Sequence, residues 1–277
     1  MININGLDSL HKIVVMNPKG GCGKTTLATN LASLYAERDP APTLVDCDPQ
    51  GFSMRWLEKR PATRPTVHGI EAYTSNEPLA AQVKPESSAL IFDLPAAIPS
   101  EQLQNFTYAA DSILIPIMPS AVDVYSATRF IADLLVDQQL DRREQKLVIV
   151  ANRVRSNTKS YQMLRSFLAS LDIPMIAVLR DCQNYVHAIA QGIGLCELPS
   201  YRTKDDVQQI DAIYTWLGRQ RAKVRIFLTT EQRQGMIADI AFQRAQDRGF
   251  EGGDPETDWV EAERELEASL MSGADGL

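Results

Sequence analysis

Residues 17–26 read Asn-Pro-Lys-Gly-Gly-Cys-Gly-Lys-Thr-Thr, a glycine-rich stretch between two different sequence patterns. A short apolar run ends just before it, at Met16, and an amphipathic helical pattern begins near Lys24. Glycines have no Cβ, so the backbone N–H groups of such a loop can converge on an anion, and the start of the following helix adds a positive end. The stretch therefore predicts a phosphate-binding loop between a strand and a helix.

The side chains at the end of this loop have separate expected roles toward a nucleotide and its metal ion. Lys24 is expected to reach the β- and γ-phosphates, and the Thr25 hydroxyl is expected to hold Mg²⁺. The expected cofactors are therefore ATP and Mg²⁺. The loop residues expected to contact the nucleotide are Gly20, Gly21, Cys22, Gly23, Lys24, Thr25 and Thr26.

Beyond the loop, the first 220 residues alternate short apolar runs with longer amphipathic stretches. Most of the runs are rich in Val and Ile and too short for buried helices, so they predict buried strands of a parallel sheet. The runs lie at residues 12–16, 43–47, 89–92, 112–118, 146–151 and 173–179. Helical patterns lie at residues 26–37, 122–137, 160–171 and 205–216. This alternation predicts an α/β fold with a doubly wound, mostly parallel sheet that binds its ligand at the carboxyl ends of the strands.

The composition excludes several other classes of protein. Of the 277 residues 44% are hydrophobic, which is enough to bury a sizeable core. No apolar run approaches the roughly 18 residues that a membrane span needs, and the first residues lack a signal-peptide pattern. The four cysteines form no Cys-x-x-Cys pair, so neither a disulfide framework nor a zinc site is expected. We therefore expect a cytoplasmic protein without a membrane partner.

The charge is distributed unevenly along the chain. Residues 1–230 contain 24 Lys and Arg against 23 Asp and Glu, whereas residues 231–277 contain 4 against 12. This change from a nearly neutral to an acidic composition suggests a domain boundary at about residue 230. We expect a nucleotide-binding domain at residues 1–225 and a small, acidic, helical module at residues 226–277.

The loop departs from the ordinary phosphate-loop pattern at two positions. Pro18 stands where that pattern has its first glycine, and Lys19 adds a second lysine. This form of the loop resembles the deviant loop of the ParA/MinD superfamily of partitioning and positioning ATPases. The resemblance implies that Lys19 reaches across a nucleotide-sandwich homodimer to the partner's phosphates in the ATP state. There it would act like an arginine finger.

Two carboxylates follow the second predicted strand, in the sequence Asp46-Cys47-Asp48-Pro49-Gln50-Gly51. The two carboxylates are expected to point to opposite sides, so at most one of them is expected to face the nucleotide directly. Taken alone, two acids in a turn are usually a solvated loop. The segment resembles the Asp-x-Asp-Pro-Gln-Gly switch of the same superfamily. The resemblance implies that Asp48 positions the attacking water and that Asp46 helps to order the Mg²⁺ shell.

Two further polar residues end later strands. Asp93 follows the apolar run at 89–92, the Walker B arrangement, in which an acid binds Mg²⁺ through water. The alternative is an Asp that caps the next helix, and Leu94 and Ala96 depart from the family pattern. Asn152 follows the run at 146–151 and matches the superfamily's Asn that contacts the adenine.

The resemblance covers residues 10–220 and favours a ParA-like branch. A MinD-type membrane positioner ends in a basic amphipathic helix, whereas this chain carries Glu-Ala-Glu-Arg-Glu-Leu-Glu at 261–267. The ParA-like branch implies a slow, Mg²⁺-dependent, partner-stimulated ATPase. It would bind DNA without sequence preference, associate with the nucleoid, and move a cargo together with an unidentified adaptor protein.

A basic cluster after the last core helix is the candidate DNA contact. It consists of Arg219, Arg221, Lys223 and Arg225, although such a run is usually a solvated face. The alternative function is an ATP-dependent switch or assembly factor that binds a protein and no nucleic acid. The module that follows resembles a short bacterial module of unknown function, with helices expected at 229–245 and 259–270. It could dock a partner or only pack on the nucleotide-binding domain.

Overall fold

The computed structural model describes residues 7, 10–74, 77–136, 140, 146–171, 173–226, 230–248 and 254–272. The chain divides into two compact units, residues 1–217 and 218–277. The boundary expected at residue 225 falls in the same helix as this division, α8 (Ser200–Ile226).

The first unit is built on a seven-stranded sheet in which all neighbouring strands run parallel. The strands lie in the order β3 (His68–Glu71), β2 (Thr43–Asp46), β4 (Ala89–Asp93), β1 (His11–Val15), β5 (Ser112–Ile117), β6 (Leu147–Val154) and β7 (Met175–Arg180). The direction of winding reverses at β1, which lies between β4 and β5. In doubly wound sheets, ligands bind outside the carboxyl ends of the strands at this switch point.

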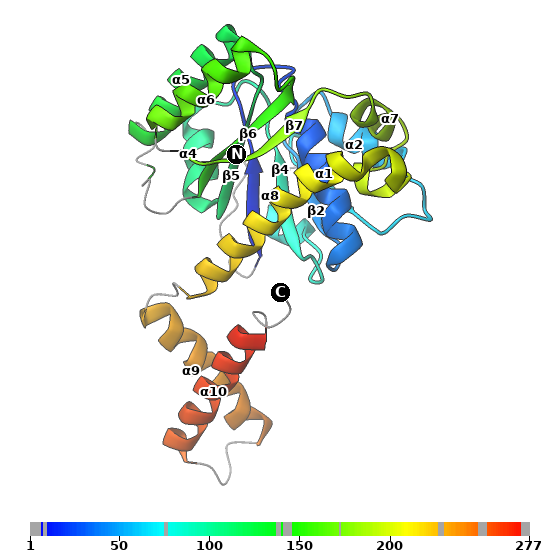
Figure 1. The fold of residues 1–277 in the computed structure, drawn as a ribbon. Helices are drawn as coiled ribbons and strands as arrows, with labels where there is room; N and C mark the ends of the chain where they lie inside the picture. Colours follow the sequence, from blue (N-terminus) through cyan, green and yellow to red (C-terminus); the bar gives the residue numbers. More distant parts are fainter. Residues whose placement is uncertain are drawn as a thin grey trace. The chain divides into compact units, whose positions relative to one another are not determined.

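Helices cover both faces of the sheet (Figure 1). One face packs against α4 (Ser100–Ala109), α5 (Ala121–Val136) and α6 (Lys159–Leu171). The other packs against α1 (Lys24–Arg38), α2 (Phe52–Glu58), α7 (Asn184–Ala190) and the first part of α8. Two short elements complete the unit, α3 (Leu79–Gln82) and the 3₁₀ helix η2 (Leu195–Glu197).

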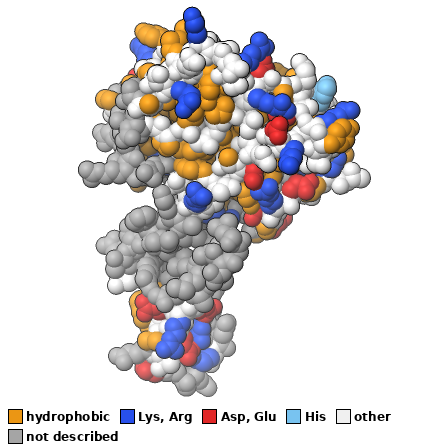
Figure 2. Space-filling view, viewed as in Figure 1, with side chains coloured by type: hydrophobic (Ala, Val, Ile, Leu, Met, Phe, Trp, Pro, Cys, Tyr) orange, Lys and Arg blue, Asp and Glu red, His pale blue; other side chains and the backbone are white. Residues whose placement is uncertain are grey.

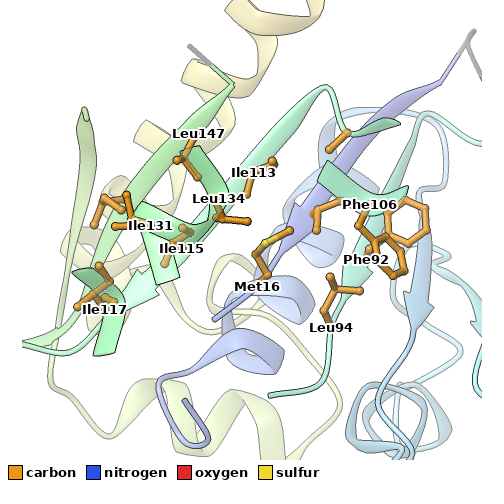
Figure 3. Close-up of a cluster of buried hydrophobic side chains, with 14 of the residues drawn as sticks. Met16, Phe92, Leu94, Phe106, Ile113, Ile115, Ile117, Ile131, Leu134 and Leu147 are labelled. Atoms are coloured by element: carbon orange, nitrogen blue, oxygen red, sulfur yellow. The ribbon is translucent and has the colours of Figure 1, made fainter. Parts of the chain in front are cut away.

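The two cores follow from the alternation of side chains along each strand. Val14 and Met16 belong to the core on the α5 side, whereas Ile13 and Val15 belong to the core on the α1 side. Figure 3 shows the first of these cores, where Phe92 packs edge to face on Phe106 of α4. A strand that is apolar on both sides is therefore buried on both sides, as the Val- and Ile-rich runs require.

The predicted α/β fold is confirmed, and the six predicted runs overlap six of the strands, with bounds that differ by up to three residues. β3 was not predicted: it is a four-residue edge strand in which only Ile70 is buried. The helices α2, α3, α4 and α7 were also not predicted. The pattern expected at 205–216 is the middle of the longer α8.

The second unit contains the helices α9 (Thr230–Asp247) and α10 (Pro255–Ser272), which pack against each other and cross in the view of Figure 1. Ile237 and Ala262 are its buried apolar residues within the described part of the chain. Arg244 pairs with Glu261 and Glu265, and Arg248 pairs with Asp258. Both helices lie close to the positions expected from the sequence.

Within the described residues, no helix combines the length and the apolar character that a membrane crossing requires.

Candidate functional site

The glycine-rich loop lies at the carboxyl end of β1, at the point where the order of the strands reverses. Gly21 and Gly23 have φ angles of 77° and 98°, which strain any residue with a side chain. A Cβ on Gly23 would also lie 2.1 Å from Asn152 Nδ2. The glycines therefore let the loop turn tightly against the end of β6.

Asn152 holds the loop in place. Its Nδ2 donates a hydrogen bond of 2.7 Å to the backbone oxygen of Cys22, and its Oδ1 accepts one from the N–H of Arg153. Arg153 has a φ of 51°, the one positive value among non-glycine residues of the described chain. The sequence assigned Asn152 to the adenine, and the structure adds a contact with the loop itself that the sequence did not predict. Its contact with adenine stays a prediction.

Lys24 is buried, and its ammonium group points into the loop. Nζ donates to the backbone oxygens of Asn17 (3.0 Å) and Lys19 (3.2 Å). Asn17 is itself anchored on β5, because its Nδ2 donates to the oxygen of Pro116 at 2.7 Å. Backbone oxygens thus occupy the donors that Lys24 would offer to phosphate oxygens.

Lys19, in the same loop, pairs with a residue that the sequence did not indicate. Its Nζ is 2.6 Å from Asp123 Oδ1, and the two side chains are 31% and 5% exposed. Asp123 lies in the first turn of α5 and also bonds Ser120, which precedes that helix. A Ser-x-x-Asp pattern signals the start of a helix, but nothing in it reveals a pairing with Lys19.

Asp46 and Asp93 end the neighbouring strands β2 and β4 and lie opposite each other in register. Asp46 is fully buried and shapes the following turn: its oxygens accept hydrogen bonds from the N–H groups of Asp48 (3.0 Å) and Met54 (3.2 Å). The Asp48 side chain is half-buried and accepts a bond from the N–H of Gln50. Asp46 is therefore engaged with the backbone, and its place in a metal shell stays a prediction.

Among the carboxylates of the site, Asp93 has the pKa that is shifted furthest from its ordinary value. Burial raises its pKa to about 7, and the nearby hydroxyls of Thr25 and Ser53 offset part of the rise. Ser53 Oγ donates to Oδ2 at 2.8 Å, whereas Oδ1 is buried without a hydrogen-bond partner among the described residues. Buried oxygens without a partner are rare and call for an explanation.

A divalent cation would give this oxygen of Asp93 a partner. Thr25 and Asp93 offer hard oxygen ligands, the type that Mg²⁺ prefers. The described residues contain no group of three or more His, Cys, Asp or Glu side chains that could hold a metal ion alone. The residues therefore fit a Mg²⁺ ion that takes its remaining ligands from nucleotide phosphates and water.

An apolar cavity of about 470 Å³ lies beside the start of the loop. Its lining has too few polar groups to bind phosphates. The lining residues are Asn17, Pro18, Ala96, Ala97, Ile98, Pro99, Leu103 and Phe130.

The four predicted DNA-binding residues all lie on α8, and their contact with DNA stays a prediction. Arg219 is exposed and Arg221 is half-buried on α8, in the second unit. The side chains of Lys223 and Arg225 lie outside the described part of the chain. On the described surface of the face in Figure 2, Lys and Arg side chains are scattered among acidic and hydrophobic ones.

Two family models match the chain. Residues 13–195 match the CobQ/CobB/MinD/ParA nucleotide binding domain. Residues 232–268 match a family of unknown function, DUF2934. The first match spans the whole site, and the second spans the helices α9 and α10.

Curated relatives match the same part of the chain. The maintenance of carboxysome distribution protein A of Halothiobacillus neapolitanus is 25% identical over 205 residues, which cover 72% of this chain and 93% of that protein. The chromosome partitioning protein ParA of Myxococcus xanthus is 31% identical over 150 residues, which cover 38% of this chain and 51% of that protein.

Solved structures share the fold. A plasmid partition protein of Borrelia burgdorferi bound to AMPPNP has a TM-score of 0.59 at 15% identity, covering 74% of this chain and 97% of that chain. The apo McdA of Cyanothece has a TM-score of 0.58 at 19% identity, and the match covers 74% of this chain and 99% of that chain.

The raised pKa of Asp93 predicts the effect of Asp93→Asn on the nucleotide-free protein. The folded state holds the Asp93 proton up to about pH 7, whereas an unfolded Asp releases it near 3.8. The contribution of Asp93 to the free energy of unfolding, on the order of a few kcal/mol, is therefore lost as the pH rises from about 4 to about 7. Asp93→Asn should raise the unfolding free energy at pH 8 and change it little at pH 4.

Urea denaturation of both proteins between pH 4 and 8 measures this difference. Asp205→Asn, which removes an exposed carboxylate on α8, controls for the change in net charge. A wild-type protein and an Asp93→Asn variant whose stability curves run parallel would contradict the prediction.

Proposed function

This chain belongs to the CobQ/CobB/MinD/ParA nucleotide-binding family, and we propose that it is an ATPase that positions a cargo by ATP-dependent dimerisation on DNA. The observation that carries the proposal is the pair of lysines in one loop. Lys24 is buried and points into the loop, whereas the Lys19 side chain is 31% exposed and pairs with Asp123. This difference supports a role for Lys24 toward the chain's own nucleotide and a role for Lys19 toward the nucleotide of a partner subunit.

The relatives support positioning over the other activities in the family. The Halothiobacillus relative is named for carboxysome distribution, and the match covers nearly all of that protein. The Myxococcus relative is named for chromosome partitioning. By analogy we propose a cargo that is a plasmid, a chromosome locus or a protein assembly, joined through an adaptor protein. A DNA-bound ATP state would associate the protein with the nucleoid.

The geometry suggests how the chain binds ATP. Lys24 exchanges the oxygens of Asn17 and Lys19 for those of the β- and γ-phosphates, because charge-assisted bonds to phosphate are stronger than bonds to neutral carbonyls. The N–H groups of residues 20–26 surround the phosphates, with Thr26 near the α-phosphate and Asn152 near the adenine.

Thr25 and Asp93 would hold a Mg²⁺ ion, which would neutralise charge on the phosphates, and Asp46 orders the turn that follows β2. Asp48, which is half-buried within that turn, would orient the attacking water. Lys19 leaves Asp123 and contacts the γ-phosphate held by the partner subunit. The need for a partner to complete the site explains why hydrolysis should be slow in the isolated chain.

Lys24→Ala should abolish ATP binding, because it removes the one cation that the structure directs into the loop among the described residues. Isothermal titration calorimetry with AMPPNP and Mg²⁺ measures the affinity. We expect a loss of at least about 100-fold, as for a charge-assisted hydrogen bond of about 3 kcal/mol. Lys204→Ala, an exposed lysine on α8, should bind as wild type does. Normal binding by Lys24→Ala would show that the loop is not the phosphate site.

Lys19→Ala should separate nucleotide binding from dimerisation. Light scattering should show that AMPPNP shifts the wild-type protein from monomer to dimer, whereas Lys19→Ala binds AMPPNP and dimerises poorly. Its hydrolysis rate should fall by about 10³-fold or more, as when an arginine finger is removed. A wild-type protein that stays monomeric at high concentration with AMPPNP would refute the sandwich model.

DNA binding should require ATP and depend on salt. If the side chains of Arg219, Arg221, Lys223 and Arg225 each neutralise one phosphate, log affinity should fall with log salt with a slope of about −3.6 per protomer. Replacing all four with Ala should weaken binding equally for all DNA sequences and leave DNA-free hydrolysis unchanged. Fluorescence anisotropy with ATP, with ADP and without nucleotide provides the measurement.

A variant that lacks four exposed cations of the first unit, Lys59, Lys84, Lys159 and Arg165, is the matched control. If DNA affinity and its dependence on salt concentration fall in this variant and not in the variant with four substitutions on α8, the DNA site lies on the first unit. If the wild-type protein binds no DNA with ATP, the chain is better described as a switch that binds a protein partner.

A further inference from the structure

Ser53 makes a contact that the catalytic roles above do not use. It lies in the first turn of α2, two residues after Gly51 and the Asp-x-Asp-Pro-Gln-Gly turn. Its hydroxyl donates to Asp93 Oδ2 at 2.8 Å, and both residues are at most 1% exposed. The helix that follows the turn carrying Asp48 is thus bound, through Ser53, to the carboxylate of Asp93.

This bond leaves the two oxygens of Asp93 in different states. Oδ2 has Ser53, whereas Oδ1 is buried without a hydrogen-bond partner within the described part of the chain. A hydrogen bond to one oxygen fixes the rotation of the carboxylate, and the free oxygen is then the one that can enter a metal shell. Hydrogen bonds of this type to metal-binding carboxylates orient the ligand and tune its affinity.

The start of α2 rests on both strand-end carboxylates. Asp46 Oδ2 accepts the N–H of Met54, and Asp93 Oδ2 accepts the hydroxyl of Ser53 next to it. Asp46 and Asp93 are paired in register on adjacent strands, so the two anchors lie side by side. Gly51 precedes the helix with a φ of 65°, which lets the chain reverse onto these anchors. Movement of Asp93 would therefore be transmitted to α2 and to the turn before it.

We propose that Ser53 is a positioning residue for the divalent cation: its hydroxyl holds Asp93 so that the free oxygen faces the metal, and it connects metal binding to the turn that carries Asp48. The proposal rests on the proposed nucleotide-binding function. In a purely structural role, Ser53 would anchor α2 equally strongly with and without the metal, whereas a positioning role makes metal binding depend on the Ser53 hydroxyl.

The test measures how much Mg²⁺ strengthens nucleotide binding. Calorimetry gives the Kd for AMPPNP in EDTA and at saturating Mg²⁺, and the ratio of the two is the contribution of the metal. Ser53→Ala should lower this ratio by about 10-fold, the lower limit seen when partners of metal ligands are removed. The Kd in EDTA should stay unchanged. Ser53→Thr, which keeps the hydroxyl, should recover most of the ratio.

Ser87→Ala is the matched control, because it also removes a buried hydroxyl bond between the β2 and β4 segments. Ser87 Oγ lies 2.7 Å from Thr43 Oγ1, at the opposite ends of these strands from Asp46 and Asp93. For Ser87→Ala, the ratio of the Kd in EDTA to the Kd at saturating Mg²⁺ should equal that of the wild-type protein. Thermal melting of each variant checks that the fold is intact, and Ser53→Cys provides a second variant of similar size with a weaker donor.

The second measurement follows α2 through Trp56, which is buried on this helix and donates to the oxygen of Ile193. In a background with Trp216→Phe and Trp259→Phe, Trp56 is the only tryptophan of the chain. Adding Mg²⁺ to the AMPPNP complex should change its fluorescence, and Ser53→Ala should remove that change.

The outcomes separate this proposal from the function on which it rests. If Mg²⁺ strengthens binding equally in wild type and Ser53→Ala, Ser53 only anchors α2 and the inference is wrong, although the ATPase proposal stands. An equal loss in Ser87→Ala would also overturn it, since the effect would then be a general loosening of β2 and β4. A wild-type protein that gains nothing from Mg²⁺ would overturn the metal site itself.

Discussion

The parallel pairing of β1 and β2 with β4 decides where the polar groups of the site lie. Because the three strands run the same way, Val15, Asp46 and Asp93 finish at one edge of the sheet in adjacent register positions. The glycine-rich loop leaves β1 at this edge, and the turn that carries Asp48 leaves β2 there. A shift of one residue in either pairing would turn the carboxylates to the opposite face. The apolar residues on both sides of each strand prevent such a shift, so the packing of two cores maintains the geometry of one site.

Within this edge, the cations of the loop are bound by the chain's own oxygens. Lys24 bonds two backbone oxygens, and Lys19 bonds Asp123. Nucleotide binding is therefore an exchange of partners rather than the filling of a charged, unsatisfied site. Buried charges that lack partners are costly, so this arrangement lets the loop keep its shape without a ligand. The free Oδ1 of Asp93 is the exception, and it marks the place where the chain alone is incomplete.

The sequence predicts what depends on local pattern and fails where distant residues meet. The glycine-rich loop and six apolar runs were sufficient to predict the sheet and the position of Lys24, since strand burial and loop chemistry are encoded locally. The edge strand β3 was missed because it buries a single residue. The bond between Ser53 and Asp93 and the pairing of Lys19 with Asp123 were missed for another reason. Each joins residues that only the folded sheet brings together, and no spacing in the sequence indicates them.

The order of the strands also has a consequence for how the chain is made. β1 is the central strand but is synthesised first, and its partners on either side come much later: Ile13 pairs with Ile91 on β4 and with Ser112 on β5. Pairings between residues so distant in sequence form slowly, because the intervening chain must lose entropy before any contact is made. During translation, the apolar β1 and the loop that follows it therefore wait without their neighbours while some hundred further residues emerge at about 5–20 per second. The nascent chain is most exposed to aggregation in this interval, and the unpaired, apolar β1 is a segment that a ribosome-associated chaperone could bind.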